Sequence, residues 1–126
     1  MMSIPPTTEP VIRVVALPAD TNPHGDIFGG WLMNLMDIGA GTVAMRRCKG
    51  RAVTVAMDGM QFHAPVSVGD ELSVYCSLVS SGRTSMTIAV EAWRRDRHED
   101  ISVKVTEANF TFVAIDDEGR PRPINP

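Results

Sequence analysis

The sequence is poor in the features that would mark a secreted, membrane-spanning or disulfide-stabilised protein. Its 126 residues include only two cysteines, Cys48 and Cys76, which have no CxxC spacing, so we expect both to be reduced and structural. The first ten residues carry no basic start and no apolar run, and no stretch reaches the roughly 20 apolar residues that a membrane helix needs. These absences predict a cytoplasmic protein without membrane insertion.

Positive charge and metal-binding patterns are also scarce. The formal net charge is −3, which argues against a continuous basic face for nucleic acid. The three histidines, His24, His63 and His98, lack the spacing of metal ligands, and no GxSxG motif is present. The sequence therefore predicts no nucleic-acid partner, no metal site and no serine hydrolase.

The composition that remains is that of an ordinary globular domain. Apolar residues make up 44% of the chain and charged residues 21%, which is far from the composition of disordered proteins. A chain of this length is expected to fill a single core. We therefore assign residues 1–126 to one domain, with residues 1–10 as a loose arm and residues 119–126 as an irregular tail.

Hydrophobic periodicity predicts one helix and five strands. A β-branched run at residues 11–17 indicates a strand, and the proline-free segment from Gly29 to about Cys48 indicates a helix that ends in a basic turn and a glycine cap at Gly50. Alternating apolar residues predict four further strands, at residues 52–62, 71–80, 85–95 and 101–115. Short turns between these strands favour an antiparallel meander.

The predicted helix is apolar around nearly its whole circumference, which is typical of a helix buried by its surroundings. A strongly curved antiparallel sheet wrapped around one long central helix would bury it, giving an α+β domain of the hotdog type. The unpaired edges of such a sheet are expected to join a second copy of the chain.

Two glycines make the start of the helix a candidate site. Gly29 and Gly30 follow a long segment of turn-forming residues that includes Asp26, and they let a ligand approach backbone N–H groups that have no partner within the helix. The helix dipole adds positive potential there, so this position can hold a developing oxyanion. The alternative is that Asp26 only caps or bends the chain and that the glycines relieve crowding.

A lone carboxylate on the helix is the second candidate. Asp37 is the only ionisable residue between Trp31 and Met45, and it shares one stripe of the helix with Asn34 and Gly41. A carboxylate is costly to bury without a partner, and proteins keep one chiefly where it binds or reacts. The alternative is an interfacial aspartate paired with an arginine.

The spacing of the two candidates favours a site shared between chains. Asp37 lies seven residues beyond Gly30, which is about 10 Å along one helix, whereas a base must lie close to its water and to the polarised carbonyl. An antiparallel neighbour across a two-fold axis could place its Asp37 near the glycines of the first chain. We therefore predict a composite site in a dimer.

Three segments of the chain resemble a known family. They read DTNPHGDIFGGWLMNLMDIGAG, RAVTVAMDGMQFHAPVSVGD and SGRTSMTIAVEAW, and in order and spacing they are similar to the YciA-type acyl-CoA thioesterases of the hotdog superfamily, over about residues 18–114. The resemblance implies hydrolysis of acyl-CoA without a metal or organic cofactor, coenzyme A being part of the substrate and product. It also implies a hexamer built as a trimer of dimers.

The resemblance assigns roles to residues at both ends of the first segment. By motif, Asp37 would activate water, Asp26 would assist positioning, and Gly30 with its neighbours would polarise the carbonyl. Further candidates for substrate binding around the helix start are Asn22, His24, Gly29 and Asn34.

A third group of candidates would bind the phosphates of coenzyme A. Arg83, with Thr84 and Ser85, matches a family motif that looks like part of the rim that binds coenzyme A, and an arginine can meet a phosphate with two hydrogen bonds. Lys49 and Arg51, beyond the predicted helix end, are further cationic candidates. The alternative for these cations is a solvated turn charge.

Two rival functions fit the same fold. A hotdog enoyl-CoA hydratase would pair a histidine with its carboxylate, and His24 lacks the expected motif around it. A non-catalytic acyl-CoA sensor would bind without hydrolysis, but the presence of both Asp37 and Asp26 argues against it. Acyl chain length is not readable from the sequence, because the candidate lining residues fit an ordinary core equally well. They are Met33, Met36, Met57, Met60 and Phe62.

Overall fold

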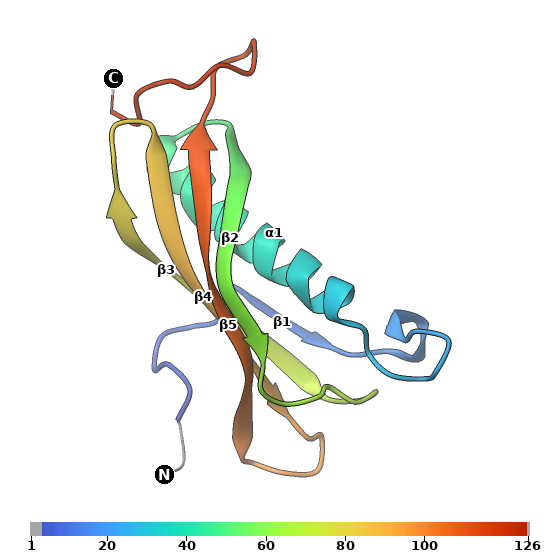
Figure 1. The fold of residues 1–126 in the computed structure, drawn as a ribbon. Coiled ribbons are helices and arrows are strands. Elements are labelled where there is room, and N and C mark those ends of the chain that lie inside the picture. The colour runs from blue at the N-terminus through green and yellow to red at the C-terminus, as the bar shows by residue number, and fades with distance from the viewer. Residues whose placement is uncertain (1–3, 126) are drawn as a thin grey trace.

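One long helix and five strands make up most of the part of the chain that the computed structural model describes, residues 4–125 (Figure 1). The elements are β1 (Ile12–Val15), a short 3₁₀ helix (Pro18–Asp20), α1 (Gly29–Cys48), β2 (Ala52–Phe62), β3 (Glu71–Ser81), β4 (Ser85–Arg95) and β5 (Ser102–Ala114). Every predicted element is present. The first strand is shorter than the predicted residues 11–17, since only four of its residues pair with β3.

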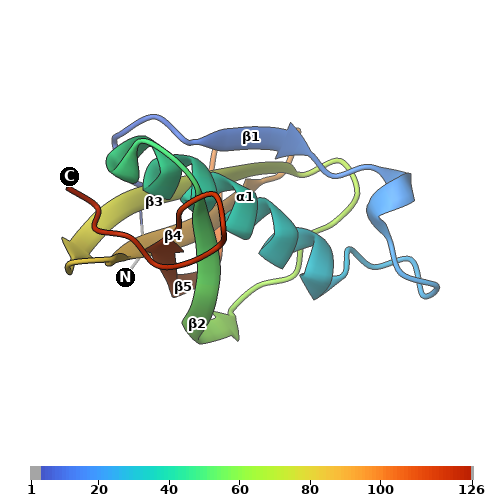
Figure 2. The ribbon, with the colours of Figure 1, turned by 90° about the horizontal axis from the view of Figure 1, so that it is seen from above.

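The five strands form one antiparallel sheet in the order β1–β3–β4–β5–β2. The sheet curves so that its two edge strands, β1 and β2, lie on opposite sides of α1 (Figure 2). The predicted α+β hotdog architecture, a curved antiparallel sheet around one central helix, is therefore confirmed.

The predicted meander is correct for three strands and wrong for the fourth. β3, β4 and β5 pair in sequence, but β2 does not pair with β3. The reason is that β1 already occupies that edge of β3, with Ile12 opposite Val74. The segment 63–70 therefore carries the chain across, and β2 pairs with β5 at the far edge, where Ala52 lies opposite Ala114.

The helix packs on the sheet along one ridge. Leu32, Met36, Ala40 and Ala44 recur every four residues and are at most 2% exposed, and they join Phe110 and other sheet residues in one core. The hydrophobic effect of burying this ridge holds the two layers together. Among the described residues, no helix is both long and apolar enough to cross a membrane.

The prediction that α1 is buried all round is wrong for the single chain. Asn34, Ile38 and Met45 are exposed, Ile38 at 49% and Met45 at 44%. The physical reason is that one sheet can cover only one side of a helix. The other side of α1 is left as a partly apolar surface.

The end of α1 differs in one detail from the predicted glycine cap. The left-handed residue is Lys49, at φ 54°, and Gly50 follows it. Gly50 serves another purpose, since a Cβ there would lie 2.5 Å from Nη2 of Arg122. That guanidinium group donates to the carbonyl oxygen of Cys48 at 2.9 Å and so satisfies one of the last helix carbonyls.

The two terminal segments are irregular, and the C-terminal one is tied to the core. Residues 4–10 contain no helix or strand, and neither do residues 119–125 apart from one isolated bridge at Pro121. Ile124 is only 4% exposed, and its N–H donates to the carbonyl oxygen of Arg83 at 2.8 Å. The predicted arm and tail also include residues 1–3 and 126, which lie outside the described residues.

Candidate active site

The start of α1 presents two backbone N–H groups. The helix begins at Gly29 and Gly30, its N-cap is Phe28, and no side chain caps it within residues 4–125. The N–H of Trp31 already donates to the carbonyl oxygen of Phe28 at 3.1 Å. Because the first N–H groups of a helix have no intrahelical acceptor and lie at the positive end of its dipole, those of Gly29 and Gly30 can donate to an oxyanion.

The loop before α1 holds Asp26 in place through Asn22. The side-chain oxygen of Asn22 accepts hydrogen bonds from the backbone N–H groups of His24 (2.9 Å) and Asp26 (3.1 Å). The N–H of Asn22 donates to the carbonyl oxygen of Asp26 at 2.7 Å, and Gly25 takes the left-handed conformation, at φ 85°, that the turn needs. Asn22 therefore organises the loop.

The side chains of His24 and Asp26 are exposed on the loop that leads to the glycine pair. The sequence left open that Asp26 caps the helix. In the structure the N-cap is Phe28, which makes no side-chain capping bond, so Asp26 does not cap α1. Asp26 is thus available to a bound molecule.

Asp37 is held by a hydroxyl group of the neighbouring edge strand. The carboxylate lies half-buried on α1, and its Oδ1 accepts a hydrogen bond from Oγ1 of Thr54 in β2 at 2.6 Å. Within the described residues its partner is this hydroxyl and not an arginine. Thr54 was not among the residues predicted from the sequence, although a polar residue between Val53 and Val55 is the signal that marks it.

One chain does not bring all predicted residues together. Asp37 follows Gly30 by seven residues on the same straight helix, about 10 Å along its axis, and Asn34 lies exposed between them. The β3–β4 turn with Arg83 lies near the opposite end of α1 from the glycine pair (Figure 1).

The β3–β4 turn is fixed by its backbone and leaves Arg83 exposed. Thr84 accepts from the N–H of Ala114 at 2.9 Å, and Ser85 accepts from the N–H of Gly82 at 2.8 Å. The guanidinium group of Arg83 makes no hydrogen bond or ion pair in the described part of the chain, so it can bind an anion. Arg51, by contrast, already donates from Nη1 to the carbonyl oxygens of residues 116 and 117 at 3.3 Å.

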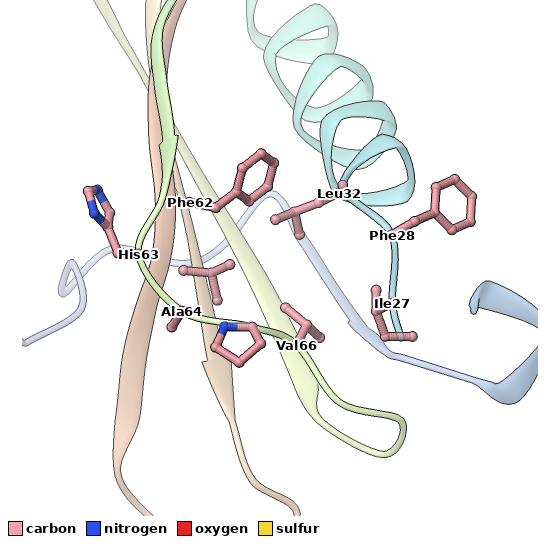
Figure 3. A pocket seen from close by; sticks show the side chains of 10 residues that line it. Ile27, Phe28, Leu32, Phe62, His63, Ala64 and Val66 are labelled. Atoms are coloured by element: carbon pink, nitrogen blue, oxygen red, sulfur yellow. The ribbon is translucent and has the colours of Figure 1, made fainter. Parts of the chain in front are cut away.

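A pocket of about 390 Å³ opens beside the glycine pair. It lies between the start of α1, the end of β2 and the segment 63–66 (Figure 3). Its lining is mostly apolar and consists of Ile27, Phe28, Gly29, Leu32, Phe62, His63, Ala64, Pro65, Val66 and Val105. The sequence offered five candidates for the lining of an acyl pocket. Phe62 is one of them and lines this pocket, whereas Met36 is fully buried in the core.

The remaining reactive side chains do not form a second centre. Burial raises the pKa of the Cys76 thiol to about 12, so the thiol stays protonated at neutral pH and is a poor nucleophile. Within residues 4–125, no three His, Cys, Asp or Glu side chains gather closely enough to hold a metal ion.

Known proteins are similar to this chain over most of its length. A family model described as the thioesterase superfamily matches residues 24–101. An uncharacterized acyl-CoA thioester hydrolase of Zymomonas mobilis is 57% identical over 121 residues, covering 96% of this chain and 81% of that protein. The acyl-CoA thioester hydrolase YciA of Escherichia coli is 48% identical over 122 residues, covering 94% and 92%. Among solved structures, the hexameric thioesterase y2039 of Yersinia pestis has a TM-score of 0.87 at 48% identity, covering 94% and 96%.

Proposed function

The chain belongs to the thioesterase superfamily, in its hotdog-fold YciA-type branch, and on this premise we propose that it hydrolyses acyl-CoA thioesters in the cytoplasm. The products are a free acid and coenzyme A. The observation that carries the proposal is the helix start, where Gly29 lines an apolar pocket and the N–H groups of Gly29 and Gly30 have no intrahelical acceptor. The backbone N–H groups can bind the carbonyl oxygen of a thioester, and the apolar pocket beside them can hold its acyl chain.

The chemistry needs only water and the residues of this chain. The thioester oxygen accepts hydrogen bonds from the glycine N–H groups, and Asp37 takes a proton from a water molecule that attacks the carbonyl carbon. Negative charge then develops on that oxygen, where the N–H groups and the helix dipole stabilise it. The C–S bond breaks, the proton held by Asp37 passes to the departing sulfur, and coenzyme A leaves as the free thiol while the carboxylic acid is released.

We place each site across a two-fold axis between two copies. The base and the glycine pair lie about 10 Å apart along one helix, which is too far for one water molecule to serve both. If the two helices run antiparallel, Asp37 and the Arg83 turn of one copy approach the glycine pair of the other. Arg83, Thr84 and Ser85 would then meet the phosphates of coenzyme A, and Asp26 would help to position the reacting groups.

Uncovered apolar surface supports such a dimer. Ile38 and Met45 on α1 are exposed, and on β2 Val53 is 42% and Val55 56% exposed. The outer edge of β2 pairs with no other strand of the described chain. A second copy would cover this surface and this edge. The relative from Yersinia pestis is hexameric, and we propose a hexamer built as a trimer of dimers here too.

Release of free thiol from acyl-CoAs of graded chain length tests the function. We expect release by the wild-type protein and a loss of about 10²- to 10⁴-fold in kcat for Asp37→Asn, the usual contribution of a general base. The circular-dichroism spectrum should be unchanged, because the amide keeps the size of the side chain. Absence of thiol release from every acyl-CoA would contradict the enzyme and leave a binding protein, whereas full activity of Asp37→Asn would contradict the assigned base.

A further inference from the structure

Phe62 lines the pocket beside the glycine pair from the side of β2. It is the last residue of β2, and its ring points toward Leu32 across the pocket, whereas the rings of His63 and Phe28 point away (Figure 3). Phe62 thus forms the wall that the end of β2 contributes to this pocket.

The ring of Phe62 also rests against the start of α1. A Cβ on Gly29 would lie 3.1 Å from Cζ of Phe62 and 3.6 Å from its Cε2. The first of these distances is shorter than ordinary van der Waals contact, so a side chain at residue 29 would require the ring to shift by a few tenths of an ångström. A carbonyl that binds the N–H of Gly29 therefore lies next to this ring.

The backbone on both sides of Phe62 is fixed. The carbonyl oxygen of Gln61 accepts from Oγ1 of the fully buried Thr106 at 2.5 Å, and the N–H of His63 donates to the carbonyl oxygen of Val105 at 2.7 Å. A bulge in β2 between Asp58 and Gln61 sets the direction in which the strand end turns. The ring can rotate about its own side-chain bonds, but the strand cannot carry it out of the pocket.

We propose that Phe62 is a specificity-determining residue that limits how long an acyl chain the pocket accepts. The inference rests on the proposed function, since it places the thioester carbonyl at the glycine pair. From that point a hydrocarbon chain enters a space with apolar walls and meets the ring of Phe62 opposite Leu32. The occupant is an uncharged acyl chain, because the lining side chains that face the space offer no partner for a charge.

The test compares kcat/KM for saturated acyl-CoAs of increasing length in the wild-type protein, Phe62→Ala and Phe62→Trp. Phe62→Ala should move the optimum to longer chains, by about fourfold in kcat/KM for each additional methylene that becomes buried. Phe62→Trp should move it to shorter chains. Val79→Ala is the control, because Val79 on β3 is, like Phe62, an exposed apolar side chain, at 60%, and it does not line the pocket. It should leave the optimum where it is.

The outcomes separate this inference from the proposed function. If the wild-type protein releases thiol but Phe62→Ala and Phe62→Trp keep its length profile, the role of Phe62 is wrong and the thioesterase stands. If no protein releases thiol, the proposed function fails, and the pocket is tested by the shift in melting temperature with saturated fatty acids. Phe62→Ala should then favour longer acids, and an unchanged profile overturns the inference. Phe62→Leu repeats both measurements should Phe62→Ala fail to fold.

Discussion

The hydroxyl group of Thr54 restricts where the Asp37 carboxylate can point, since the two groups lie 2.6 Å apart on different elements. A base that must meet one water molecule benefits from such an orienting partner, because small displacements of catalytic groups are costly to rate. Thr54 touches Asp37 in the structure and is therefore assigned to positioning it.

Replacing Thr54 tests that assignment. Thr54→Val keeps the shape of the side chain and removes the donor, so kcat for acyl-CoA should fall about tenfold, the equivalent of one charged hydrogen bond of about 1.4 kcal/mol. KM should change little, and Thr54→Ser should restore most of the rate. A fall in melting temperature with unchanged kcat would assign Thr54 a structural role instead.

At this scale the sequence predicted some residues and concealed others. Asp37 stood out because it is the one carboxylate in an apolar helix, and the glycine pair because the first N–H groups of a helix have no intrahelical acceptor. The sequence shows Thr54 as a polar residue between two valines but conceals its partner, because that partner depends on where β2 lies, and a bulge between Thr54 and Ala56 alters the strand register. Hydrophobic periodicity carries no information about the position of β2 in the sheet or about this bulge.

Among the elements, α1 packs on β2, β3, β4 and β5, and β1 and β2 form the two edges of the sheet. Alternating apolar residues specified the strands to within a few residues, because the side-chain period is set by the backbone. The place of β2 beside β5 could not be predicted in this way, since it depends on which sheet edge is still free.

Two methionines of α1 offer a matched test of this packing. Met36 is fully buried and Met45 is 44% exposed on the same helix. Met36→Ala should lower the free energy of unfolding by about 2–5 kcal/mol, the range for buried methionine. Met45→Ala should lower it by less, since this side chain is partly exposed in the chain and contributes only to the surface that a second copy would cover. Urea denaturation at one protein concentration measures both, and equal losses would contradict the described packing of α1.

The whole molecule leaves one side of its central helix uncovered. The apolar circumference of α1 predicted burial on all sides, but within one chain the sheet covers only the side of the helix that contains Met36. A sequence pattern cannot distinguish surface buried within a chain from surface buried between chains, because both are apolar. The difference between prediction and structure is therefore itself an argument for a second copy.

A shared site has a consequence that a site within one chain does not have. In a dimer of Asp37→Asn with Asp26→Ala, one site receives both lesions and the other receives neither. If each site lay within a single chain, both sites of the mixed dimer would carry a lesion. Mixing two weakly active variants therefore reports directly on where the parts of the site come from.

The decisive measurement is thiol release from an acyl-CoA by Asp37→Asn and Asp26→Ala, each alone and after joint refolding. Random pairing at equal amounts should return activity to about a quarter of the wild-type sites, as a two-fold dimer requires, well above either variant alone. Activity of the mixture that stays at the mean of the two parents, although light scattering and differently tagged copies show that mixed dimers have formed, would contradict the shared site.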